Sequence, residues 1–304
     1  MGGVPVIDMH MHLFPRFGGN MQSRQYGKVQ LQDGSLFQAM PPSFVNTDSS
    51  PEVALAYMDW CGVDKALLLQ GGLHGPQNSF YLNVVKRWPD RFVAFVMVDP
   101  TEGDTAARPL RELLDQGLLG LKLELIELRK AHPEFSFLGQ EEMKVWEVCA
   151  EKNAPIAVHL SQDERSLQEA AHIRQLLQCW PNLSFMVCHI GFPPFEHWKQ
   201  RALLGLHPNV YLDTAAFYWY FNEILGQTYP FPGGLEALKW VVDAVGTDKL
   251  LWGSDYPMTL TLTTYAQMLD LIRQEATFLS EEQKAQVLGG NAAKLLAKWQ
   301  AART

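Results

Sequence analysis

Cysteine is scarce in this chain, and its cysteines are not closely spaced. The four residues, Cys61, Cys149, Cys179 and Cys188, include no C-x-x-C pair. This spacing argues against a disulfide framework and against a zinc knuckle. We expect small hydrophobic side chains that are buried in the core of a protein from a reducing compartment.

The chain also lacks an excess of basic side chains and any long apolar run. It carries 25 lysines and arginines against 33 acidic residues, for a formal net charge of -8, which argues against non-specific binding of nucleic acid. No uncharged apolar run approaches the ~20 residues of a membrane-spanning helix, and the first residues do not resemble a secretory signal. These absences predict a soluble, cytoplasmic protein whose partner is a small-molecule substrate.

A dinucleotide-binding motif is missing as well, because no G-x-G-x-x-G sequence follows an apolar run. Short apolar runs instead alternate with amphipathic segments, a pattern typical of strands buried on both faces of a parallel sheet. The predicted strands are Val4–Asp8, Lys65–Leu69, Phe92–Val98, Leu118–Leu123, Pro155–His159, Leu183–Cys188, Val210–Asp213 and Leu250–Gly253. Eight strand–helix units favour an α/β fold, with one closed (β/α)₈ barrel domain over residues 1–304.

Further helices are expected after the last predicted strand. Ser280 and Gln283 have the spacing of a capping box that begins a helix. Gly289 and Gly290 are expected to end that helix, and Asn291 to cap the next one.

Residues 14–50 interrupt the strand–helix alternation. This insert is rich in Gly, Gln, Ser, Pro and aromatic residues and shows no clear period. A loop of such length is usually functional or disordered. It is therefore either a lid or substrate-contacting segment over the barrel mouth, or a flexible or dimer-forming segment.

Histidines and an aspartate stand where predicted strands end. His10 and His12 follow the first strand, His159 and His189 end the fifth and sixth, and Asp255 follows the eighth. Because the C-terminal ends of barrel strands share one mouth, these side chains are expected to converge. Imidazole and carboxylate groups suit Zn²⁺ in an open catalytic site, with one histidine left for proton transfer. Singly, each residue has a structural alternative, as a core hydrogen-bonding group or, for Asp255, a helix cap.

Other polar residues are candidates for a substrate pocket. Lys122 and Glu124 share one face of the fourth strand. Either an unmodified Lys122 contacts substrate, or a carbamylated Lys122 or a bridging Glu124 holds a second metal ion. Arg16 in the insert and His74 after the second strand are further candidates for substrate binding. Cys188 is expected to point away from the mouth, into helix packing.

Together these segments resemble the amidohydrolase superfamily. The H-x-H pair and the segments C-H-I-G-F-P-P-F, H-P-N-V-Y-L-D-T, L-L-W-G-S-D-Y-P and L-G-G-N-A-A-K-L-L are similar to its amidohydrolase-related branch. That branch includes aminocarboxymuconate semialdehyde decarboxylase, resorcylate-type decarboxylases and dicarboxylate lactonases. The resemblance implies a distorted (β/α)₈ barrel with one divalent ion, Zn²⁺ or alternatively Mn²⁺. It implies His10, His12, His159 and Asp255 as metal ligands, with His189 and Asp255 handling protons.

Two enzyme functions fit this set of residues. The first is a hydrolase that opens a lactone, amide or ester of a small cyclic or carboxylated substrate through metal-activated water. The second is a metal-dependent, non-oxidative decarboxylase of an aromatic or enoic acid. A non-catalytic scaffold is a third possibility. Aromatic residues such as Trp198, Trp219 and Trp240 are consistent with a homodimer.

Overall fold

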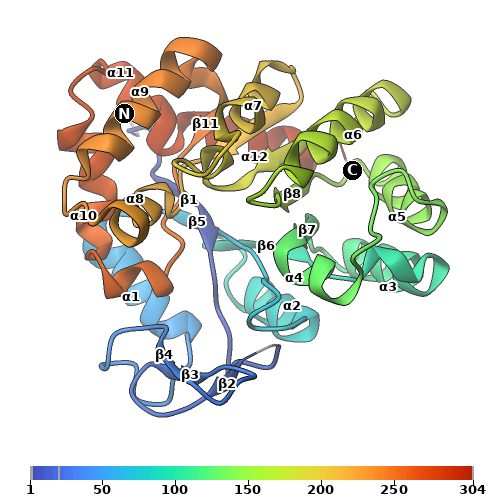
Figure 1. Cartoon of the computed structure of the whole chain (residues 1–304), viewed down its shortest axis with the longest axis horizontal. Coiled ribbons are helices and arrows are strands. Elements are labelled where there is room, and N and C mark those ends of the chain that lie inside the picture. The colour runs from blue at the N-terminus through green and yellow to red at the C-terminus, as the bar shows by residue number, and fades with distance from the viewer. Residues whose placement is uncertain (1–2, 20, 303–304) are drawn as a thin grey trace.

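A parallel barrel forms the centre of the computed structural model, which describes residues 3–19 and 21–302. Its eight strands are hydrogen-bonded in chain order. They are β1 (Ile7–Met11), β5 (Lys65–Leu68), β6 (Phe92–Val96), β7 (Gly120–Glu124), β8 (Ile156–His159), β9 (Phe185–Val187), β10 (Val210–Asp213) and β11 (Leu250–Leu251). The predicted barrel is confirmed (Figure 1).

The chain around and beyond β11 brings the ring nearly to closure against β1. The amide of Met9 donates to the carbonyl of Trp252, and the amide of His12 donates to that of Tyr256, both at 2.8 Å. The first strand begins three residues later than predicted, at Ile7. Pro5 has no N–H to donate to a ladder, so this part of the chain does not extend the strand. The strand also ends three residues later than predicted, at Met11, so His10 lies within β1 rather than after it.

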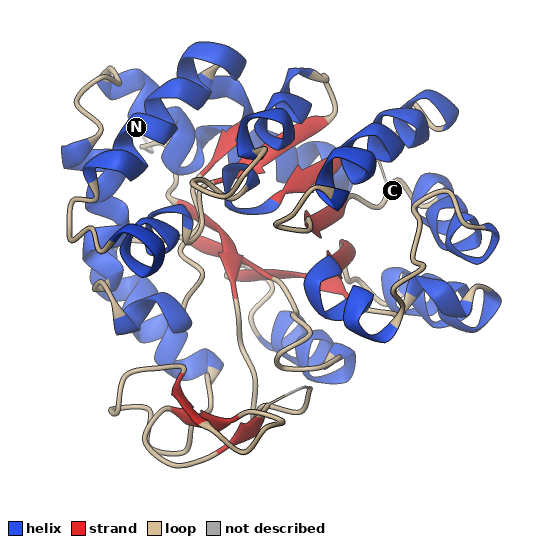
Figure 2. Cartoon of the chain, in the orientation of Figure 1, coloured by secondary structure: helices blue, strands red, loops and turns tan. Residues whose placement is uncertain are grey.

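Helices surround the barrel on its outside (Figure 2). They are α1 (Pro51–Cys61), α2 (Asn78–Arg87), α3 (Asp104–Asp115), α4 (Leu125–Ala131), α5 (Gln140–Glu151), α6 (Arg165–Cys179), α7 (Trp198–Ala202), α8 (Phe217–Leu225), α9 (Pro232–Val245), α10 (Tyr265–Asp270), α11 (Glu281–Ala285) and α12 (Asn291–Ala301). Within residues 3–19 and 21–302, no helix has the length and apolar character needed to cross a membrane.

The N-terminal half of the barrel interior, which we call the floor, is apolar. Side chains from six strands pack here against Leu295 and Trp299 of α12. They are Met9, Leu67, Phe95, Ala157, Met186 and Leu251. The rings of Phe95 and Trp299 have centroids 6.0 Å apart. The last helix thus seals this end of the barrel and leaves the opposite end open for a site.

The C-terminal helices follow the prediction at their start and depart from it at the glycines. Ser280 and Gln283 form the predicted capping box. The expected break at Gly289 and Gly290 is wrong, because a π-helical turn (Gln286–Gly290) continues directly into α12. A Cβ atom on Gly289 would lie 1.7 Å from the carbonyl oxygen of Pro5, so this glycine permits close packing. Asn291 donates to the carbonyls of Thr247 and Leu250 instead of capping a helix.

The insert folds into a small antiparallel sheet, which the sequence analysis did not predict. Its strands are β2 (Gln22–Ser23), β3 (Lys28–Gln30) and β4 (Leu36–Gln38). Asp33 and Gly34, a pair typical of hairpin turns, lie between β3 and β4. Phe14 and Ser49 exchange two backbone hydrogen bonds, which tie the ends of the insert together. In Figure 1 it extends below the barrel from the end of β1.

Candidate active site

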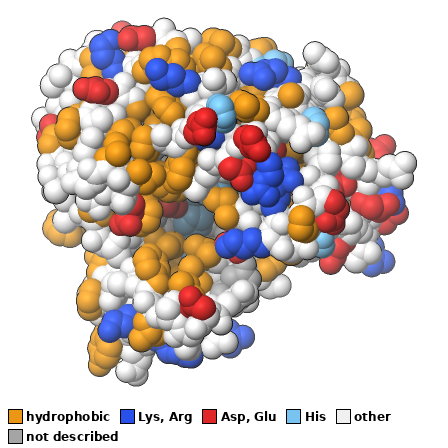
Figure 3. All heavy atoms as spheres, viewed as in Figure 1, with side chains coloured by type: hydrophobic (Ala, Val, Ile, Leu, Met, Phe, Trp, Pro, Cys, Tyr) orange, Lys and Arg blue, Asp and Glu red, His pale blue; other side chains and the backbone are white. Residues whose placement is uncertain are grey.

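A cavity of about 330 Å³ opens at the C-terminal mouth of the barrel. The residues that line it include His10, His12, His74, Lys122, Glu124, His159, His189 and Asp255, with Met21, Phe37 and Ala39 from the insert. Figure 3 shows the surface hollowed between the barrel and the insert. The insert therefore forms part of the cavity wall.

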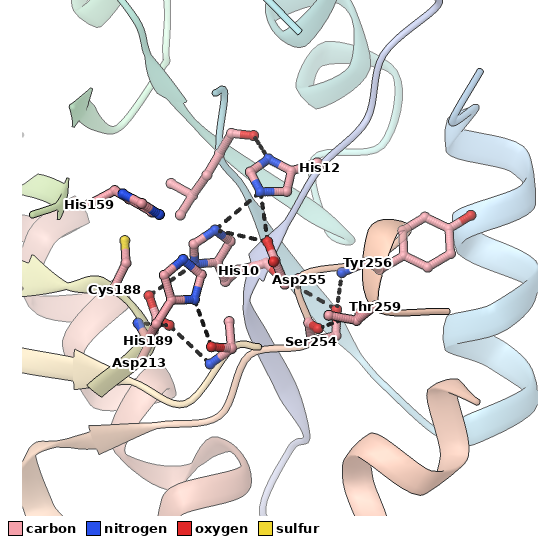
Figure 4. A network of polar contacts seen from close by, with 12 residues as sticks. His10, His12, His159, Cys188, His189, Asp213, Ser254, Asp255, Tyr256 and Thr259 are labelled. Atoms are coloured by element: carbon pink, nitrogen blue, oxygen red, sulfur yellow. Dashed lines mark hydrogen bonds and ion pairs between the residues drawn. The ribbon is translucent and has the colours of Figure 1, made fainter. Parts of the chain in front are cut away.

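Three of the predicted ligands converge at the bottom of this cavity (Figure 4). The Nε2 atoms of His10 and His12 lie 3.2 Å apart. Oδ1 of Asp255 lies 2.9 Å from Nε2 of His12 and 3.4 Å from Nε2 of His10. Asp255 has a φ of 60°, and its amide donates to the carbonyl of His10 at 2.8 Å. This turn aims its carboxylate back at β1.

In His10 and His12, the hydrogen-bond partner of Nδ1 determines whether Nε2 is a donor or an acceptor. Nδ1 of His12 lies 2.6 Å from the carbonyl oxygen of Leu69, which can only accept, so Nδ1 carries the proton. Nδ1 of His10 lies 3.0 Å from Oδ2 of Asp213. In their neutral forms both Nε2 atoms therefore present lone pairs toward Asp255. Three acceptors this close repel one another unless a cation, either a proton or a metal ion, lies among them. Such a donor set, with an ordered outer shell, could hold a metal ion.

The charges of Asp255, His12 and His159 suit metal binding, whereas the charge of His10 opposes it. Burial opposes ionisation of Asp255, but its close contact with His12 and the charge of His10 hold its pKa well below the usual range. Burial lowers the pKa of His12 and of His159, so both are neutral at pH 7, as ligation requires. Burial also acts against protonation of His10, but the neighbouring Asp213 and Cys188 outweigh it and raise its pKa to about 10. A proton therefore competes with a metal ion at His10.

His159 at the end of β8 and His189 in the turn after β9 face the same space, with ring centroids 5.1 Å apart. Nδ1 of His159 lies 3.5 Å from Oε1 of Glu124 without a hydrogen bond. It lies outside the tight group formed by His10, His12 and Asp255. Nδ1 of His189 lies 2.6 Å from the carbonyl oxygen of Ala215, which leaves Nε2 as its free nitrogen. Burial and the charge of His10 lower the pKa of His189 to about 4.

Asp213, which was not among the predicted site residues, organises this cluster. Its Oδ2 contacts His10, and its Oδ1 accepts from the amides of His189 and Ala215 at 3.0 Å. The available signal was its position at the end of the seventh strand, where other site residues end theirs.

The expectation for Cys188 is wrong, because its side chain points into the barrel. Its Sγ lies 3.4 Å from Nζ of Lys122 and groups with His10 and Asp213. The strand ends at Val187, and a φ of 58° at His189 turns that residue out of the strand alternation, so its place in the cavity does not fix the direction of Cys188. Two other cysteines also depart from the buried interpretation, since Cys61 is half-buried and Cys179 is exposed.

The candidate substrate-binding residues are divided between the cavity and the surface. Lys122 is buried and lines the cavity. Glu124 lines it too and caps α4 by accepting from the amide of Ile126, and burial raises its pKa to about 7. His74 is buried at the cavity wall, whereas Arg16 is exposed and outside the cavity lining.

Known proteins similar to this chain share its fold. The sequence profile of the amidohydrolase family matches residues 7–298. A probable 2-pyrone-4,6-dicarboxylic acid hydrolase from Acinetobacter baumannii, with citric acid bound, superposes with a TM-score of 0.71 at 19% identity, over 96% of this chain and 99% of that one. A zinc-bound amidohydrolase from Burkholderia multivorans gives 0.70 at 14% identity, over 96% and 99%. A 5-carboxyvanillate decarboxylase from Sphingomonas paucimobilis gives 0.60 at 19%, over 84% and 86%. No curated protein sequence matches significantly.

Proposed function

Because the chain belongs to the amidohydrolase family, we propose that it is a metal-dependent hydrolase of a small cyclic or carboxylated substrate, with Zn²⁺ as its metal. The observation that carries the proposal is the convergence of three acceptors, on His10, His12 and Asp255, within 3.4 Å of one another. His159 would complete the ligand set from β8. A bound divalent ion lowers the pKa of water and polarises a carbonyl group.

The remaining residues supply binding and proton transfer. His189 holds its Nδ1 proton on Ala215, so its Nε2 is free to take a proton from attacking water and return it to the leaving group. Lys122, buried 3.4 Å from Cys188, places an ammonium group in the cavity wall where a carboxylate or a developing oxyanion binds. The apolar lining from Leu73, Trp219 and Met258 holds a flat ring and limits access of bulk water.

Decarboxylation of an aromatic or enoic acid is the second candidate. Lys122 favours it, because an ammonium group beside the ligand cluster can hold the carboxylate that leaves as CO₂. The decarboxylases of similar fold act on such acids, as the name 5-carboxyvanillate decarboxylase states. A cytoplasmic location and a homodimer remain predictions from the sequence.

Metal analysis of the purified protein tests the proposal. We expect about one tightly held divalent ion per chain, lost in Asp255→Asn and retained in Asp163→Asn, a control in an exposed aspartate paired with Arg165. Loss of turnover on chelation and its return with Zn²⁺ support the enzyme, and metal-free wild-type protein with full activity contradicts it. Ring or ester opening on a panel of lactones, esters and aromatic acids supports hydrolysis, whereas CO₂ release supports the second candidate.

A further inference from the structure

His74 is buried at the cavity but has no hydrogen bond through its ring. Its side chain is 4% exposed, and neither Nδ1 nor Nε2 has a partner among the described residues. It lines the same cavity as His12 and Asp255. Buried polar atoms are nearly always paired, because leaving them unpaired costs free energy. The two nitrogens therefore indicate a ligand group that the cavity receives.

The ring of His74 is fixed in place by its neighbours. It stacks on Phe14, with centroids 4.4 Å apart and an interplanar angle of 17°, and contacts Phe17 at 5.0 Å. Its other neighbour is the ring of His12 at 5.0 Å. The His74 carbonyl also accepts from the amide of Gly18 at 2.9 Å, which joins this loop to the insert. The imidazole is thus held ready for binding, close to the ligand cluster.

The surroundings of His74 define the chemistry of its partner. A neutral imidazole offers a donor at one nitrogen and an acceptor at the other, and a hydroxyl group, which can donate or accept, matches either one. The cavity wall is largely apolar, with Phe37, Leu73, Ile126, Trp219 and Met258. In the part of the chain that the structure describes, Lys122 is the only lysine or arginine that lines it. Apart from the histidines, the lining therefore offers a single cationic side chain to a carboxylate, and it lies beside the ligand cluster.

We propose that His74 is a substrate-specificity residue that hydrogen-bonds an uncharged hydroxyl group on a flat, mostly apolar substrate. This deepens the proposed function and rests on it, because the contact lies beside the metal ligands. His74 selects among substrates through binding and takes no part in metal ligation.

The test compares the affinities of phenol and toluene, two probes of similar shape, by ligand-observed NMR. Wild-type protein is expected to bind phenol about tenfold more tightly, both metal-loaded and chelator-stripped, the reach of one buried hydrogen bond. Toluene is the more hydrophobic probe, so burial alone gives the opposite order. His74→Phe keeps the ring against Phe14 and should bind both probes within about twofold. His74→Gln, which keeps a donor and an acceptor, should retain part of the preference.

A control and three outcomes make the test decisive. His132→Phe, in a half-buried histidine paired with Asp99, should leave the preference unchanged. Equal affinities in wild-type protein overturn the proposal, as does a preference that survives in His74→Phe. A preference seen only with metal assigns phenol to the ion and also overturns it. Because the stripped protein is measured separately, failure of the metal-dependent function is distinguished from failure of the His74 contact.

Discussion

The two halves of the barrel interior differ in chemistry although the same strands build both. On β8, Ala157 belongs to the apolar floor and His159 to the mouth. On β9 and the turn after it, Met186 packs in the floor and Cys188 lies beside Lys122. Side chains two residues apart share a strand face, so a shift of two residues along a strand leads from the packed core to the cavity. Along the barrel axis, the residues that stabilise the fold therefore lie at one end and the residues of the candidate site lie at the other.

The two halves also differ in how their buried side chains are stabilised. The floor requires only close packing, whereas each polar side chain of the mouth requires a partner. Asp213, the carbonyl of Leu69 and the carbonyl of Ala215 supply such partners to His10, His12 and His189. Substitutions in the floor should therefore change folding stability, and substitutions in the mouth should change metal binding and turnover.

The largest effect is expected from removing a ligand in the mouth. His12→Ala should lose the metal and reduce turnover by more than about 10⁴-fold, because the activation of water that the ion supplies is lost. Metal content and steady-state rates measure this, with thermal unfolding to verify that the apolar floor still folds. Retained metal with near-normal turnover would remove His12 from the ligand set.

His189→Asn should separate proton transfer from metal binding within the mouth. Turnover is expected to fall by roughly 10²–10⁴-fold, the usual contribution of one acid or base. The metal content should stay at the wild-type value, since Nδ1 of His189 contacts Ala215 and the ring is placed for proton transfer. An unchanged rate would contradict its role.

A substitution that leaves a cavity in the floor should lower folding stability without changing metal binding. Phe95→Ala, which removes a ring packed on Trp299, is expected to lower the free energy of unfolding by about 3–5 kcal/mol. Urea unfolding measures this, and the metal content per folded chain should not change. Trp60→Ala is the matched control, because Trp60 is 81% exposed and should change stability by less than about 0.5 kcal/mol. Loss of metal in folded Phe95→Ala protein would break the separation between the halves.

The smallest effect concerns the outer shell of the mouth. Asp213→Asn should weaken metal affinity by roughly 10–100-fold, because an amide nitrogen in place of Oδ2 no longer accepts from His10. Competition with a chelator of known affinity measures the change. An affinity equal to that of wild-type protein would show that Asp213 has only a packing role.

Local sequence patterns were sufficient for the candidate residues that stand at the end of one predicted strand. His10, His12, His159 and Asp255 stand beside apolar runs, so an eight-strand barrel was enough to place them at one mouth. Cys188 and Gly289 could not be placed in this way. The first depends on a turn with positive φ at His189, and the second on close contact with Pro5, which is distant in sequence. The three short strands of the insert lacked the apolar periodicity on which strand prediction depends, although Asp33-Gly34 marked one turn.

The junction between the first and last strands of the barrel has a consequence for folding. His10 and His12 belong to the first strand, Asp255 follows the last, and few backbone bonds join these segments. An ion bound by these side chains would link the two ends of the sheet. Its binding free energy would then add to the free energy of unfolding, so the melting temperature should rise with metal concentration.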